Sequence, residues 1–126
     1  MKDVADKIVE IARGTGLHLV TNRISWDGGE VQTAIGIPTR KQVKRKIWRG
    51  FFCVRWKSDA LNFWLPQNAE LSALSDHYTL EIQPAPVTHK TGGKRHSILA
   101  MTRLSKLNLD DPRHKEFIET VISMNR

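Results

Sequence analysis

The sequence predicts an α+β domain: an N-terminal helix, a mostly antiparallel five- or six-stranded sheet built of hairpins, and a C-terminal helix. Two amphipathic segments stand near the ends of the chain, and alternating apolar segments punctuated by glycine and proline fill its middle. No strand–helix–strand alternation is visible, which argues against a doubly wound parallel sheet. The chain of 126 residues has the size of one domain, and we place no boundary within residues 1–126.

The two helices are marked by their caps and by their apolar stripes. Asp3 caps a first helix that is expected to run to about Ala12. Asp111 caps the last helix, and Pro112 occupies the first turn, where its missing N–H costs nothing. Spacings of three and four predict the buried positions, which are Val4, Ile8, Ile11 and Ala12 in the first helix and Phe117, Ile118, Val121 and Ile122 in the last.

The middle of the chain predicts strands at residues 17–26, 31–37, 47–56, 61–65, 78–83 and 98–104, with one or two helical turns at 68–74. The Asp27-Gly28-Gly29-Glu30 string supplies the positive φ angles of a tight hairpin. The strongest strand is 47–56, where alternation divides the side chains between two faces. The set expected to face the core is Trp48, Gly50, Phe52, Val54 and Trp56, and the set on the opposite face is Ile47, Arg49, Phe51, Cys53 and Arg55.

Positive charge is concentrated in two stretches. The chain has 20 Lys and Arg against 13 Asp and Glu, a formal charge of +7. Residues 40–57 hold eight basic side chains and no acid, so the other 108 positions sum to −1. A smaller cluster lies at residues 89–96, around Gly92-Gly93. This pattern predicts a polyanionic partner. The residues expected to bind nucleic acid are Arg40, Lys41, Lys44, Arg45, Lys46, Arg49, Phe51, Arg55, Lys90, Lys94 and Arg95.

The string Arg49-Gly50-Phe51-Phe52-Cys53-Val54-Arg55-Trp56 resembles the signature strand of RNA recognition motif domains, in which exposed aromatics stack on bases. The resemblance covers eight residues. It departs from the pattern at Phe52, in a small-residue position, and at Cys53, in a stacking position, and the expected hairpins depart from the family's order of elements. We assign no family. Independently, Phe51 would lie between Arg49 and Arg55 as a platform for stacking and phosphate pairing, the alternative being that it packs beneath a terminal helix.

Two enzymatic interpretations compete with binding alone. His89 and His96 flank the glycine loop and would act as acid and base on RNA, as in small basic, toxin-like ribonucleases. Asp76 and Glu81 weakly resemble the acidic core of restriction-type, metal-dependent nucleases, although Gln83 stands where lysine is usual. A third class is a protein-interaction module for an acidic partner, or a homodimer formed through an exposed sheet edge.

Other residues give no sign of a metal or cofactor site. Cys53 is the one cysteine, which excludes an internal disulfide and zinc sites built on two or more cysteines. The remaining histidines have no ligand spacing, so no metal and no cofactor are expected. The reduced cysteine and the partly acidic, amphipathic N-terminal segment favour a cytoplasmic protein outside the membrane. The sequence therefore favours a nucleic-acid-binding module over an enzyme, and leaves DNA or RNA open.

Overall fold

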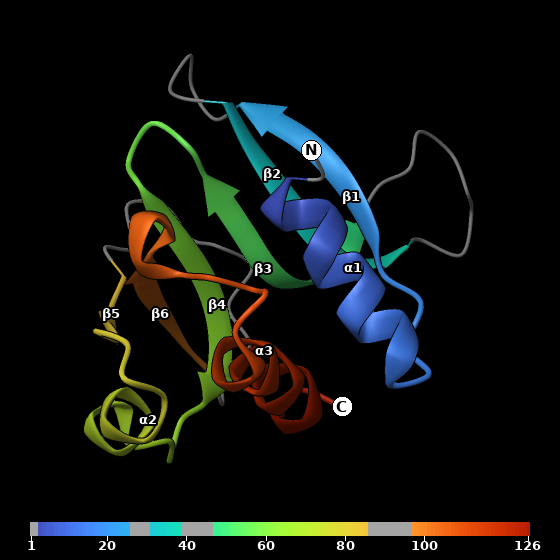
Figure 1. Ribbon diagram of the computed structural model, residues 1–126. Helices are drawn as coiled ribbons and strands as arrows, with labels where there is room; N and C mark the ends of the chain where they lie inside the picture. Colours follow the sequence, from blue (N-terminus) through green and yellow to red (C-terminus); the bar gives the residue numbers. More distant parts are fainter. Residues whose placement is uncertain (1–2, 26–30, 39–46, 86–96) are drawn as a thin grey trace.

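The computed structural model of the chain describes residues 3–25, 31–38, 47–85 and 97–126. The described chain begins and ends with a helix, and the strands and a shorter helix lie between them (Figure 1). The elements are α1 (Val4–Gly14), β1 (Val20–Ser25), β2 (Val31–Pro38), β3 (Ile47–Arg55), β4 (Ala60–Pro66), α2 (Leu71–Tyr78), β5 (Gln83–Pro84), β6 (Ser97–Arg103), the 3-10 helix η1 (Leu104–Lys106) and α3 (Pro112–Met124). The predicted α+β class is confirmed.

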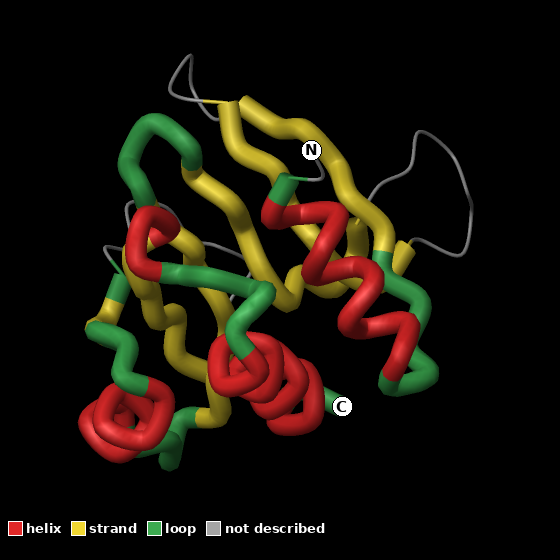
Figure 2. The backbone as a smooth tube through the Cα atoms, viewed as in Figure 1, coloured by secondary structure: helices red, strands yellow, loops and turns green. Residues whose placement is uncertain are grey.

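The strands form one six-stranded sheet in the order β1-β2-β3-β4-β6-β5, and its neighbouring strands pair antiparallel. Helices α1 and α3 cover one face of this sheet, which we call the helix face (Figures 1 and 2). The opposite face is called the distal face. Two layers result, with the apolar core between the sheet and the terminal helices.

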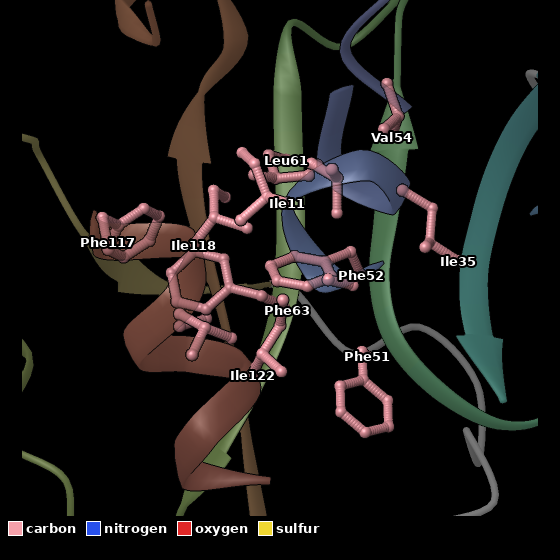
Figure 3. Close-up of a cluster of buried hydrophobic side chains, with 14 of the residues drawn as sticks. Ile11, Ile35, Phe51, Phe52, Val54, Leu61, Phe63, Phe117, Ile118 and Ile122 are labelled. Atoms are coloured by element: carbon pink, nitrogen blue, oxygen red, sulfur yellow. The ribbon is translucent and has the colours of Figure 1, made fainter. Parts of the chain in front are cut away.

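Both terminal helices begin at the predicted caps. The Asp3 carboxylate accepts a hydrogen bond from the Asp6 amide at 3.0 Å, and the Asp111 carboxylate accepts one from the Arg113 amide at 2.9 Å. These bonds satisfy amides that have no partner inside the helix. The predicted stripes face the sheet, and Phe117 packs edge-on against Phe63 of β4, with ring centroids 5.2 Å apart (Figure 3).

The segment after β4 differs from the prediction, because the helical turns expected at 68–74 continue to Tyr78, and only Gln83 of the expected strand at 78–83 is in a strand. Residues Leu71–Tyr78 form α2, and only Gln83–Pro84 pair with β6. Tyr78 is buried at the end of this helix, where its hydroxyl lies 2.7 Å from the Thr120 hydroxyl of α3. Thr79 ends the helix in the left-handed conformation, with φ of 54°. Packing of Tyr78 against α3 thus overrides the local alternation.

A β-bulge interrupts β3 in the strand with the strongest alternating pattern. Ile35 of β2 is opposite Phe52, but the next residue, Gly36, is opposite Gly50, so Phe51 is an extra residue in the ladder. Such an insertion breaks strict alternation and redirects side chains. Phe51 and Phe52 are accordingly both buried in the core cluster (Figure 3). Val54 is buried as predicted.

Candidate nucleic-acid interface

Both basic segments join the sheet at the same end. The first, residues 39–46, connects the end of β2 at Pro38 to the start of β3 at Ile47. The second, within residues 86–96, leads into β6 at Ser97, which is paired with Pro66 at the end of β4. Because β3 and β4 are antiparallel, the start of β3 and the end of β4 lie at one end of the sheet. We call this end, defined by Pro38, Ile47, Pro66 and Ser97, the segment end.

The strands that follow the two segments are close neighbours. β4 alone separates β3 from β6 in the strand order, and β3 pairs with β4 from Phe52 to Arg55. The sequence does not reveal this proximity, because 50 residues separate Ile47 from Ser97. The proximity of β3 and β6 follows from the strand order, in which β4 lies between them and β5 forms the edge of the sheet beside β6.

The charge excess lies outside the described residues. Those residues contain eleven Lys and Arg and eleven Asp and Glu, so the described part of the chain is formally neutral. The predicted binding residues Arg40, Lys41, Lys44, Arg45, Lys46, Lys90, Lys94 and Arg95 all fall in the segments that join the segment end, outside the described residues. The acids Asp27 and Glu30 belong to a segment that connects β1 and β2 at the other end of the sheet. Charge is therefore distributed unequally between the two ends.

Arg49 does not share a face with Arg55, and this part of the prediction is wrong. Its guanidinium donates a hydrogen bond to the carbonyl oxygen of Asn125, at the end of α3, and lies 5.3 Å from the centroid of the Phe51 ring. The Arg49 Nε is buried and has no hydrogen-bond partner among the described residues. Asn125 in turn donates to the Trp64 carbonyl oxygen at 2.8 Å. Arg49 thus lies on the helix face and ties β3 to the last turn of α3, where a cation also complements the helix dipole.

The expected stacking platform at Phe51 is also wrong. Phe51 is 1% exposed, because the bulge turns it into the core. The alternative, that this side chain packs beneath a terminal helix, agrees with its place in the core cluster. Of the predicted strand residues, Cys53 and Arg55 lie on the distal face, where they pair with Asn62 and Ala60 of β4. Both are half-buried, and the Cys53 thiol lies 3.0 Å from the Gln32 side-chain oxygen.

Trp56, which alternation assigned to the core, is instead 48% exposed. It follows the last residue of β3 and begins the turn to β4, beyond the part of the sheet that the helices cover (Figure 1). The signal that could have revealed this is the polar run Lys57-Ser58-Asp59, which ends the strand directly after Trp56. Trp64 is half-buried and lies near Gly50, whose added Cβ would be 3.7 Å from the indole nitrogen.

The residues of the enzymatic interpretations do not form a site in the described structure. His89 and His96 lie outside the described residues. Asp76 is on α2 and Glu81 follows it in the connection to β5, and both are exposed. Over residues 3–25, 31–38, 47–85 and 97–126, no group of three or more histidine, cysteine or acidic side chains is placed to hold a metal ion.

Two other histidines have structural contacts. His114 is buried, and its Nδ1 accepts a hydrogen bond from the Asn108 amide at 2.8 Å, which fixes the turn before α3. His77, expected in a strand, is exposed on α2 with its Nε2 3.7 Å from the Glu116 carboxylate. Neither arrangement aligns a base with a nucleophile or a substrate pocket.

Within the described part of the chain, no helix has the length and apolar character needed to cross a membrane. No family model, curated protein or solved structure matches the chain, so its function is inferred from the arrangement of its own residues.

Proposed function

We propose that this protein is a small nucleic-acid-binding module that contacts phosphates through the two basic segments joined to the segment end. The observation that carries the proposal is the placement of Pro38, Ile47 and Ser97 at one end of the sheet. The segments that contain Arg40, Lys41, Lys44, Arg45 and Lys46, and Lys90, Lys94 and Arg95, therefore both join the sheet at this end.

The charge distribution of the chain favours a polyanion over a small anion as the partner. Eight basic residues belong to two segments that join one end of a formally neutral body, which favours a positive field at that end. Double-stranded DNA carries one charge per about 1.7 Å of axis, so it offers several phosphates to such a field at once. Contacts of this kind supply affinity and orientation but do not read sequence.

The test is the salt dependence of binding in two variants of equal net charge. One carries Lys44→Gln, Arg45→Gln and Lys46→Gln, and the control carries Arg13→Gln, Arg113→Gln and Lys115→Gln, three exposed residues on α1 and α3. Each variant loses three charges, so a general effect of net charge affects both equally. With duplex DNA and structured RNA as probes, the first variant should lower the slope of log K against log salt by up to about 0.9 per lost contact.

The control variant should retain the wild-type slope. Equal losses in both variants, or an unchanged slope in the first, would contradict the proposal. If the wild type binds polyglutamate and neither DNA nor RNA, the module recognises an acidic protein instead, and the proposed function is wrong.

A further inference from the structure

A second cluster of exposed side chains surrounds the turn between β3 and β4, at the end of the sheet opposite the segment end. Trp56 is 48% exposed there. Three basic side chains in and beside the turn are also exposed. We define the Trp56 cluster as Trp56, Lys57, Arg103 and Lys106.

Hydrogen bonds hold this turn against the 3-10 helix η1. The Asp59 amide donates to the Trp56 carbonyl oxygen at 3.2 Å, and Asp59 adopts the left-handed conformation with φ of 51°. Its carboxylate accepts from the Ser105 amide at 2.8 Å and from the Ser105 hydroxyl at 2.7 Å. The Leu104 amide donates to the Asp59 carbonyl oxygen. The exposed tryptophan is therefore presented by a turn that is fixed on both sides.

The described residues in the turn and in η1 carry a net positive charge. Arg103 is opposite Ala60, the first residue of β4, and Lys106 ends η1. Both lie close enough to Asp59 to contribute, after the Ser105 hydroxyl, to lowering the pKa of its carboxyl. Asp59 is the one acid in the two stretches 55–60 and 103–106, and both its oxygens are engaged by Ser105. Lys57, Arg103 and Lys106 are thus three exposed cations in and beside the turn that begins at Trp56, against the one carboxylate of Asp59.

We infer that the Trp56 cluster binds single-stranded nucleic acid, with a base stacked on Trp56 and phosphates held by Lys57, Arg103 and Lys106. This inference rests on the proposed function and names its substrate class. An exposed indole gains stacking energy only from an unpaired base, whose face is free, whereas the paired bases of a duplex are already stacked. Exposed cations in the turn and in η1 match the phosphates that flank such a base.

The dimensions allow one strand to contact both ends of the sheet. β4 runs the length between them, and its six steps from Ala60 to Pro66 span about 20 Å. A strand with the duplex spacing of about 3.4 Å per nucleotide covers that length with about six nucleotides, and a more extended strand needs fewer. A strand of this length or longer can therefore span from the Trp56 cluster to the segment end.

The experiment compares Trp56→Ala, Trp56→Phe and a control, Met124→Ala, which removes another exposed hydrophobic side chain, on α3. Dissociation constants are measured for a 12-nucleotide single strand and for the duplex of the same sequence. Trp56→Ala should weaken single-strand binding about 5- to 150-fold and leave duplex binding within twofold. Trp56→Phe should restore most of the affinity, and Met124→Ala should change neither constant.

Two outcomes overturn this inference while leaving the proposed function intact: unchanged single-strand affinity in Trp56→Ala, or equal losses for strand and duplex. In both cases the Lys44, Arg45 and Lys46 variant still tests the phosphate contacts separately. If Trp56→Ala instead weakens binding to polyglutamate alone, the cluster docks an acidic peptide and the inference is wrong. Circular dichroism of each variant shows that the fold is retained, as expected for a residue outside the core.

Discussion

Replacing Phe51 with alanine tests the bulge in β3, because the bulge is the reason that this residue is buried. Phe51 is 1% exposed. A buried phenylalanine removes about 200 Å² from water, which at about 25 cal/mol per Å² corresponds to about 5 kcal/mol. Alanine retains part of that burial, and the loss of the Arg49 contact at 5.3 Å from the ring adds a smaller penalty. We expect Phe51→Ala to lower the free energy of unfolding by about 4 kcal/mol.

The assay is urea unfolding followed by circular dichroism. With a slope of about 1.5 kcal/mol per M, the unfolding midpoint should fall by roughly 2.7 M. Phe52→Ala, at 2% exposure, should cost a similar amount, whereas Trp56→Ala should cost less than about 1 kcal/mol. If Phe51→Ala does not fold, Phe51→Leu provides a milder test, with a loss of about 1 kcal/mol. A near-neutral Phe51→Ala beside a severe Phe52→Ala would refute the bulge and restore strict alternation.

Three further predictions concern stability and activity. Because the Ser105 hydroxyl lowers the pKa of Asp59 below its ordinary value of 3.8, the ionised carboxylate stabilises the fold above pH 3.8, and this contribution is lost as pH falls through the lowered pKa. The urea midpoints of wild type and Asp59→Asn should therefore converge below pH 3.8, and a constant difference would contradict the assignment. Arg49→Ala should accelerate amide hydrogen exchange in the last turn of α3 without changing the salt slope of nucleic-acid binding, whereas a lowered slope would place Arg49 at a phosphate. RNA incubated with the protein from pH 5 to 8 should remain intact, and a bell-shaped cleavage rate abolished by His96→Ala would establish an enzyme instead.

The sequence predicts the fold wherever local signals and tertiary packing agree. Asp3 and Asp111 begin the two helices because their carboxylates cap amides that the helix leaves unpaired. The facing of β3 is predicted only in part, because the bulge depends on pairing with β2, a long-range contact that alternation does not contain. The helical turns expected at 68–74 are found in α2, but its extension to Tyr78 is missed, since the burial of Tyr78 depends on Thr120 and α3, more than 40 residues away.

In the candidate interface, the residue types could be predicted from the sequence, but their positions in the fold could not. The charge of residues 40–46 and 90–95 is evident from the sequence, but their attachment to one end of the sheet follows from the strand order. Arg49 appears equivalent to its basic neighbours in sequence, yet it contacts the end of α3. Trp56 belongs by alternation to the core, and its exposure arises because β3 ends beside it.

The most direct measurement of the central claim is a map of backbone amide chemical shifts as a 12-nucleotide single strand is added to the labelled protein. If the two basic segments bind phosphates as proposed, the amides where these segments join the sheet, those of Ile37, Ile47 and Ser97, should respond most strongly. Amides on the outer surfaces of α1 and α3, such as those of Arg13 and Lys115, should change little. Largest changes on those helices, with Ile47 and Ser97 unaffected, would contradict the account.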